Sequence, residues 1–246
     1  MSWNRRHFTA LIGWAACGWA NGPAMAQPPS RNAAEANRET AAAANRVVLV
    51  VGDSLSAEYG LARGTGWVAL LQQTLAAADP SVRVVNASVS GDTTSGGRSR
   101  LPALLAQHRP QVVVLELGGN DALRGLPLTM TRDNLAHMAR ASRQAGARVL
   151  LLGMEMPPNY GARYAQEFRE VYAQVARDQQ TALVPFFLKG VADGPDPTRW
   201  FQADRIHPNE AAQPLMRDTV WPALRPLLAA GPLPSPKDAH SNPVRR

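Results

Sequence analysis

The stretch from Arg46 to Ser56 reads RVVLVVGDSLS. Five consecutive aliphatic residues, Val47 to Val51, match a strand that is buried on both faces, because such strands are nearly continuous apolar runs. Gly52, Asp53 and Ser54 follow at once and predict a sharp polar turn at the carboxyl end of the strand. Since strands of this kind are typical of parallel sheets, the stretch indicates an α/β protein with Ser54 at the rim of its sheet.

Further apolar runs of this kind follow along the chain, and helical patterns lie between them. Further candidate strands, rich in β-branched and aliphatic residues, are Val82 to Val85, Val112 to Leu117, Val149 to Leu152 and Leu183 to Phe187. Helical patterns fall at residues 67–78, 98–107, 134–144 and 164–179. Repeated strand–helix units imply parallel strands joined by right-handed crossovers. We therefore expect an α/β fold, a three-layer α/β/α sandwich with a five-stranded parallel sheet.

The last helical pattern, Glu210 to Leu228, contains three prolines, Pro214, Pro222 and Pro226. Proline lacks the backbone N–H and its ring collides with the preceding turn, so this helix is predicted to be broken or kinked.

The N-terminal residues predict export. Arg5 and Arg6 precede an apolar run from Phe8 to Ala20, and residues 24–26 read Ala-Met-Ala, an A-x-A cleavage pattern. The run is shorter than the about 20 apolar residues of a spanning helix, so we expect a signal peptide over residues 1–26 and no stable membrane span. The arginine pair fits an ordinary secretory signal or a twin-arginine signal, and both remain open. Either route leads to a periplasmic or secreted protein.

The chain of 246 residues is long enough for one well-buried domain. Residues 27–45 are rich in Ala and Asn and predict a flexible linker, the folded domain is expected over residues 46–229, and residues 230–246 predict a disordered Pro-rich tail. Cys17 is the only cysteine and lies inside the signal, so the mature protein cannot form an internal disulfide. A lipid on Cys17 is disfavoured, because Trp14 stands where a lipidation motif normally has Leu.

The formal net charge of +7 and the pI of about 10.4 raise the question of a nucleic-acid or anionic-membrane partner. Arg5 and Arg6 leave with the signal, however, and Arg245 and Arg246 end the tail. The remaining charges are scattered, without the basic cluster interleaved with aromatic residues that a nucleic-acid groove requires. We therefore predict a solvated basic surface, no nucleic-acid partner and a monomer.

Ligands of open α/β sheets bind beyond the carboxyl ends of the strands. The segments that follow three of the predicted strands are polar and contain glycine: residues 52–54, 86–91 and 118–121. These three turns should therefore line one rim of the sheet and form the functional site.

Ser54, Asp204 and His207 are the candidate catalytic residues. A serine hydroxyl attacks a carbonyl well only when a base takes its proton, and a carboxylate bonded to one nitrogen of a histidine leaves the other nitrogen free for that task. A helix cap at Ser54 and an ordinary surface turn for Asp204 and His207 remain alternatives. The other histidines, His7, His108, His137 and His240, are too few and too dispersed for a zinc site. We expect neither a metal nor a cofactor.

Gly91 and Asn120 are candidate donors for the oxyanion that forms during acyl transfer. A glycine lets its backbone N–H approach a substrate closely, and a side-chain amide cannot lose its proton by titration. A simple turn role is the alternative for each of them. Asp53 and Asp121 are interpreted as residues that hold these loops.

Taken together, the motifs resemble the SGNH (GDSL) hydrolase superfamily over about residues 46–228, and most closely its arylesterase, thioesterase and lysophospholipase branch. The four matching blocks, in order, are Gly52-Asp53-Ser54-Leu55-Ser56, residues 86–93 around Gly91, Gly118-Gly119-Asn120-Asp121, and Asp204 to Pro208. The resemblance implies a flavodoxin-like sheet, a triad of Ser54, Asp204 and His207, and an oxyanion hole of the Ser54 and Gly91 backbone N–H groups with the Asn120 side chain. It also implies that the loop from Leu123 to Pro127 moves when acyl chains bind.

Apolar residues of the rim loops favour an aliphatic acyl chain: Leu123, Leu126, Leu128, Met154 and Met156. We predict substrate contacts from Asp53, Asp121, Leu123, Leu126, Pro127 and Met156, although the apolar ones could equally belong to the core. The expected activity is a serine esterase acting on aryl, acyl or lysophospholipid esters and on acyl thioesters. A carbohydrate O-deacetylase of the same superfamily is an alternative. A non-catalytic phosphate-binding module is a remote one, because no Gly-rich phosphate-binding motif is present.

Overall fold

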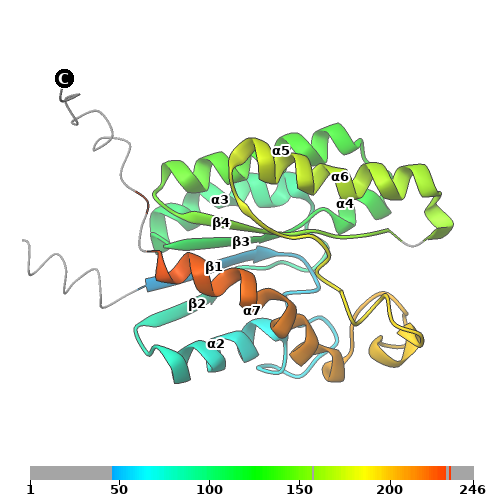
Figure 1. Ribbon diagram of the computed structural model, residues 1–246, viewed down its shortest axis with the longest axis horizontal. Coiled ribbons are helices and arrows are strands. Elements are labelled where there is room, and N and C mark those ends of the chain that lie inside the picture. The colour runs from blue at the N-terminus through cyan, green and yellow to red at the C-terminus, as the bar shows by residue number, and fades with distance from the viewer. Residues whose placement is uncertain (1–45, 157, 231–232, 234–246) are drawn as a thin grey trace, which may run out of the picture. The chain divides into compact units, whose positions relative to one another are not determined.

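The computed structural model describes residues 46–156, 158–230 and 233. Its sheet has five parallel strands in the order β2-β1-β3-β4-β5 (Figure 1). The strands are β1 Arg46–Gly52, β2 Val82–Asn86, β3 Val112–Glu116, β4 Arg148–Leu152 and β5 Ala182–Val184. This is the flavodoxin-like order, in which the chain reverses its direction of winding between β1 and β3. All five predicted strands are present, although β5 ends at Val184 and not at the predicted Phe187.

Two layers of helices cover the sheet. Helices α2 (Trp67–Ala78) and α7 (Gln213–Ala229) lie on one face. The other face carries α3 (Thr94–His108), α5 (Leu128–Gln144) and α6 (Ala162–Gln179), as Figure 1 shows. The short helix α4 (Gly119–Leu123) and the 3₁₀ turns η1 (Pro158–Tyr160), η2 (Pro197–Trp200) and η3 (Glu210–Ala212) complete the described elements. The predicted three-layer α/β/α sandwich is confirmed.

The core follows the apolar runs of the sequence. Residues 47–51 of β1 and 112–116 of β3 are buried completely or nearly so, as expected for central strands that are covered on both faces. Strand β2 lies at the edge and leaves Arg83 and Asn86 exposed. Trp67 is the largest fully buried side chain, and its ring meets Phe187 edge to face at 5.3 Å.

The last helical segment is not interrupted at Pro222 or Pro226, whereas Pro214 lies in the first turn of α7, directly after η3. Helix α7 runs without interruption from Gln213 to Ala229 and includes Pro222 and Pro226. Both prolines lie on its exposed side, where water can replace the missing hydrogen bonds. The opposite side is held by a buried stripe that packs against the sheet and α2: Met216, Val220, Leu224 and Leu228. Packing of this stripe outweighs the local cost of proline.

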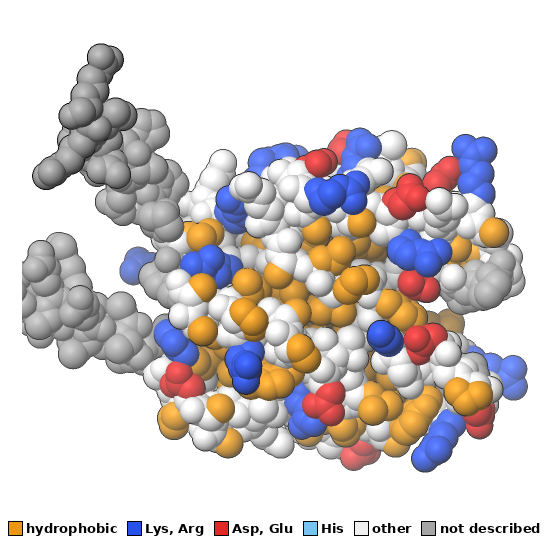
Figure 2. All heavy atoms as spheres, viewed as in Figure 1, with side chains coloured by type: hydrophobic (Ala, Val, Ile, Leu, Met, Phe, Trp, Pro, Cys, Tyr) orange, Lys and Arg blue, Asp and Glu red, His pale blue; other side chains and the backbone are white. Residues whose placement is uncertain are grey.

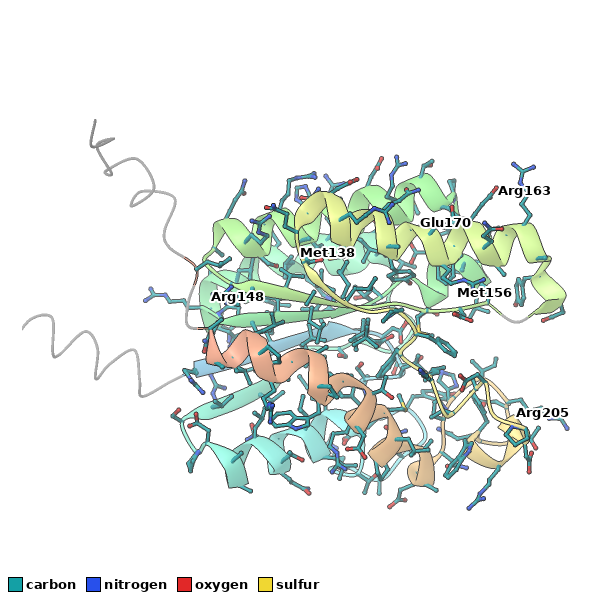
Figure 3. The ribbon with its side chains drawn as sticks, in the orientation of Figure 1. Met138, Arg148, Met156, Arg163, Glu170 and Arg205 are labelled. Atoms are coloured by element: carbon teal, nitrogen blue, oxygen red, sulfur yellow. The ribbon has the colours of Figure 1, made fainter. Side chains whose placement is uncertain are left out.

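The carboxyl ends of the strands lie together at one end of the molecule. Figure 3 shows Met156, which follows β4, and Arg205 at that end, whereas Arg148, which begins β4, lies at the opposite end. The three polar turns after β1, β2 and β3 therefore share one rim, as the sequence predicted.

The predicted signal peptide, the linker over residues 27–45 and all but residues 230 and 233 of the predicted tail lie outside the described residues. Within the described part of the chain, no helix is both long enough and apolar enough to cross a bilayer. On the face seen in Figure 2, Lys and Arg side chains are spread among Asp and Glu rather than gathered into one basic patch.

Candidate active site

Ser54, His207 and Asp204 form a continuous chain of hydrogen bonds. The Ser54 Oγ lies 2.9 Å from His207 Nε2, and His207 Nδ1 lies 2.6 Å from Asp204 Oδ2. Ser54 follows β1 directly, and the next α-helix begins only at Trp67 and is capped by Gly66. Ser54 therefore caps no helix, and its hydroxyl is engaged by the imidazole instead. Three residues that are distant in the sequence meet here in the geometry of a nucleophile, a base and an orienting carboxylate.

A tight turn holds His207 in place. Asp204 Oδ1 accepts the backbone N–H groups of Ile206 and His207, each at 3.0 Å, while Oδ2 faces the imidazole. Hydrogen bonding from the His207 ring, followed by the two backbone bonds, lowers the pKa of Asp204 to about 2. One carboxylate thus shapes the turn and orients the ring, and it stays ionised over the whole range in which a histidine titrates.

Tyr59 covers the imidazole, which the sequence analysis did not predict. The Tyr59 and His207 rings are 4.3 Å apart between centroids, tilted by 39°. Gln202 joins the two loops, because its Nε2 donates to the Tyr59 carbonyl at 2.9 Å and to the Pro208 carbonyl at 3.1 Å. No motif marks either residue, since both act through a contact between loops that are far apart in the sequence.

Two of the groups predicted to stabilise the oxyanion are the backbone N–H groups of Ser54 and Gly91. Among the described residues, neither the Ser54 nor the Gly91 backbone N–H has a hydrogen-bond acceptor. Gly91 has a φ of +78°, a conformation that side chains disfavour, so a glycine is required at this turn. Backbone N–H groups without an acceptor can bind a developing negative charge, and the oxyanion role of these two groups stays a prediction.

Asn120 is fixed by Asp53. The Asn120 Nδ2 donates to Asp53 Oδ2 at 3.0 Å, which uses one of its two amide hydrogens and leaves the other free. Asp53 Oδ1 accepts the Leu55 backbone N–H at 3.0 Å and so also holds the nucleophile turn. Asp53 therefore links the turn of Ser54 to the amide of Asn120.

Glu116 lies beneath this pair in the core and was missed as a functional residue. Its Oε2 accepts the Ser56 hydroxyl at 2.7 Å and the Asp53 backbone N–H at 3.3 Å. Trp67 Nε1 in turn donates to the Ser56 Oγ at 3.2 Å. Burial, followed by the charge of Asp53, raises the pKa of Glu116 well above its usual range. A charged residue inside an otherwise apolar strand was the one signal in the sequence.

Asp53 should lower the stability of the protein at neutral pH. Burial is the main cause that raises the pKa of Asp53 from 3.8 to about 6. The native state therefore keeps a proton that the unfolded chain loses, so stability falls as the pH rises from about 4 to about 6. The unfolding free energy of Asp53→Asn minus that of wild type should therefore increase by about 2 kcal/mol from pH 4 to pH 8. Urea unfolding at both pH values measures this, and an equal difference at the two would contradict it.

Asp121 has a structural role. It is fully buried and accepts the Thr94 backbone N–H at 2.9 Å, the Thr94 hydroxyl, and the Thr131 hydroxyl at 3.2 Å. These bonds tie the start of α3 to α4 and α5. Of the two interpretations from the sequence, the one in which Asp121 holds the loop matches this geometry, whereas a direct substrate contact does not.

A cavity of about 420 Å³ opens beside the triad. Its wall contains Asp53, Ser54, Asn120 and His207 together with a largely apolar set: Leu55, Leu123, Met154, Met156, Tyr160, Phe168, Phe186, Leu188, Ala192, Phe201 and Ile206. Leu123 and Met156 were predicted to contact substrate and lie in this wall. Leu126 and Pro127, also predicted, are not part of it. Phe186 and Leu188, which follow β5, were not predicted.

In the described part of the chain, no group of three or more His, Cys, Asp or Glu side chains is arranged to hold a metal ion.

The chain is similar to several characterised proteins. It is 56% identical over 189 residues to the esterase TesA of Pseudomonas aeruginosa, covering 77% of this chain and 92% of that protein. It is 42% identical over 187 residues to thioesterase 1/protease 1/lysophospholipase L1 of Escherichia coli, covering 76% and 87%. The crystal structure of the esterase EstA from Pseudoalteromonas sp., inhibited by monoethylphosphonate, matches with a TM-score of 0.70 and 39% identity, covering 75% of this chain and all of that one.

A family model matches the chain over residues 50–214, which include the turns that carry Ser54, Gly91, Asn120 and His207. The sequence similarity, the sheet order and the positions of these turns agree with one another. The chain belongs to the GDSL-like lipase/acylhydrolase family.

Proposed function

We propose that this chain hydrolyses carboxylic esters through a covalent acyl-enzyme formed on Ser54, with His207 as the base and Asp204 as its orienting carboxylate. The observation that carries the proposal is the 2.9 Å approach of His207 Nε2 to the Ser54 Oγ, with Asp204 2.6 Å from the other ring nitrogen. Asp204 selects the tautomer in which Nδ1 carries the hydrogen, so Nε2 faces the hydroxyl as an acceptor.

In the first half of the reaction, the Ser54 Oγ bonds to the ester carbonyl carbon as its proton passes to His207 Nε2. The carbonyl oxygen becomes an oxyanion, which the Ser54 and Gly91 backbone N–H groups and the free amide hydrogen of Asn120 stabilise. When the tetrahedral intermediate collapses, the ester C–O bond breaks and His207 returns the proton to the leaving alcohol. Water then repeats these steps on the acyl-enzyme, releasing the acid and free Ser54.

The cavity wall supports an aliphatic acyl group as the substrate portion bound by the enzyme. Met154, Met156, Phe186 and Leu188 present apolar surface next to Ser54, and a buried methylene stabilises a complex by about 0.8 kcal/mol. The names of the relatives, which include an esterase, an arylesterase and a thioesterase 1/lysophospholipase L1, point to the same class. Aryl, acyl or lysophospholipid esters and acyl thioesters are therefore the proposed substrates, and no observation favours a sugar acetate.

A series of para-nitrophenyl esters from acetate to decanoate tests this proposal. We expect kcat/KM to rise with chain length, by about fourfold for each methylene that enters the cavity, and then to level off when the cavity is filled. Met156→Trp should move this maximum towards shorter chains, because the larger side chain occupies part of the cavity. A strict preference for acetate in both proteins would contradict the acyl-chain assignment and favour the O-deacetylase alternative.

Export stays a prediction. It rests on Arg5, Arg6, the apolar run from Phe8 to Ala20 and the cleavage pattern at residues 24–26, all outside the described residues. We propose on this basis that the enzyme acts in the periplasm or outside the cell.

A further inference from the structure

Arg205 has a left-handed backbone conformation inside the hydrogen-bonded turn of His207, where its N–H donates to the Gln202 carbonyl at 2.9 Å. Four described residues other than glycine have a positive φ: Glu58, Arg109, Gln180 and Arg205. Arg109 and Gln180 end helices α3 and α6, where a left-handed residue is usual. The Glu58 carboxylate accepts the backbone N–H groups of Gly64 and Gly66. Arg205, with φ +59°, neither ends a helix nor has a side-chain hydrogen bond in the described structure.

Arg205 is one of the residues that border the cavity. Arg205 is exposed, belongs to the cavity wall and precedes His207 by two residues in the same tight turn. Figure 3 shows it at the end of the molecule where Met156 also lies. An arginine in the left-handed region carries a steric cost that glycine avoids. Such costs tend to persist where the side chain has a function.

The guanidinium of Arg205 is not neutralised by any carboxylate of the described structure. Within the described residues, no carboxylate lies within ion-pair distance of it. Asp204, next in the chain, directs both of its oxygens to the turn and the His207 ring. Glu155, the other acidic residue of the cavity wall outside the active site, pairs with Arg169 at 3.7 Å. The positive charge of Arg205 is therefore available to an anionic ligand at the cavity wall.

The position of Arg205 determines which part of the substrate its side chain can contact. His207 Nε2 must face the leaving oxygen in order to protonate it, so the leaving group lies on the side of the His207 turn. The proposed oxyanion donors Ser54, Gly91 and Asn120 follow β1, β2 and β3. The apolar residues assigned to the acyl chain, such as Met156 and Phe186, follow β4 and β5, whereas Arg205 belongs to the turn of His207. We infer that the Arg205 guanidinium binds a carboxylate or phosphate carried by the leaving group of the ester. This inference rests on the proposed esterase function and adds a preference for anionic leaving groups.

Three substrates separate this preference from general activity. The first is para-nitrophenyl butyrate, which is neutral. The second is the butyrate ester of a nitrophenol with a ring carboxylate, which places the charge on the leaving group. The third is the mono-para-nitrophenyl ester of succinate, which places the charge on the acyl side. The quantity of interest is kcat/KM for each anionic ester divided by kcat/KM for the neutral one.

For Arg205→Gln, this ratio should fall about threefold to tenfold for the leaving-group carboxylate, and much less for succinate. Arg205→Lys should lie between Gln and wild type, because an ammonium keeps the charge but not the planar fork. Salt should weaken the wild-type preference. Arg83→Gln is the matched control: Arg83 is exposed on β2, away from the cavity wall, and its loss should leave the ratio unchanged.

Arg205→Gly separates a ligand role from a structural one. Glycine adopts a positive φ freely, so the melting temperature should be at least that of wild type while the anionic preference is lost. A lower melting temperature with an unchanged ratio would show that Arg205 is structural. An unchanged ratio in Arg205→Gln, or an equal loss for succinate, would overturn the leaving-group assignment. Failure of the wild-type enzyme to hydrolyse the neutral ester would instead contradict the proposed function itself.

Discussion

A Ser54→Ala enzyme should hydrolyse para-nitrophenyl butyrate about 10⁴- to 10⁶-fold more slowly than wild type. The substitution removes the only oxygen that lies within hydrogen-bond distance of His207 Nε2 in the described structure, and with it the covalent route. Residual activity would come from the oxyanion donors and from binding alone, which do not depend on the hydroxyl. Steady-state kinetics gives the loss in kcat, and labelling with a fluorophosphonate reports on the nucleophile directly.

The matched control is Ser99→Ala, because Ser99 is an exposed serine on α3 and has no side-chain hydrogen bond among the described residues. Wild type and Ser99→Ala should react with the fluorophosphonate, and the modified peptide should contain Ser54. The phosphonate-inhibited structure of the similar esterase EstA makes this class of reagent a reasonable probe. Near wild-type hydrolysis or labelling in Ser54→Ala would refute the proposed mechanism.

Asn120→Ala should lower kcat by about 10²- to 10³-fold. The side-chain amide is the one donor of the proposed oxyanion hole that a substitution can delete, since the other two donors are backbone groups. The Asp53 bond at 3.0 Å fixes the amide in advance, so it requires no reorganisation when the charge develops. Because the interaction strengthens in the transition state, KM should change little while kcat falls.

Two further measurements distinguish the loss of an oxyanion donor from a general loss of structure. The melting temperature of Asn120→Ala should fall by only a few degrees, because the deletion leaves one oxygen of the buried Asp53 carboxyl group without its donor, which costs about 1 to 3 kcal/mol. Asn120→Asp keeps the shape but places a carboxylate beside the developing oxyanion and beside Asp53, so it should be no more active than Asn120→Ala. A loss of less than tenfold, or a loss confined to KM, would exclude Asn120 as an oxyanion donor.

The buried carboxyl pair gives these two predictions a common structural basis. Glu116 holds the Asp53 backbone and the Ser56 hydroxyl, and Asp53 holds Asn120 and the Leu55 N–H. The turn of Ser54 and the amide of Asn120 are thus held, directly or through Asp53, by the carboxyl group of Glu116 at the end of β3. Burial of these groups carries a cost in stability, which is the cost that Asp53→Asn is expected to reveal.

Local sequence patterns were sufficient to predict the strands and the rim of the sheet. The continuous apolar runs of β1 and β3 predicted central strands, because only strands covered on both faces have no polar side. The polar turns after these strands marked the rim of the sheet, because parallel strands end on the same side. The pairing of Asp204 with His207 was also predictable, since both residues come from one turn.

Other features depended on packing between distant segments. The buried stripe of α7 overcame the signal of Pro222 and Pro226, which act only locally. Tyr59 reaches His207, and Phe186 and Leu188 join the cavity wall, through loop positions that no periodic pattern encodes.

The sequence by itself therefore determined the strands, the order of the functional turns and the chemical types of the groups they carry. These follow from periodicity and from backbone preferences over a few residues. Only the tertiary structure decided the shape of the cavity, the burial of Glu116 and the unpaired position of Arg205. Each of these depends on which side chains of separate segments compete for the same space and the same hydrogen-bond partners, and that competition exists only in the folded chain.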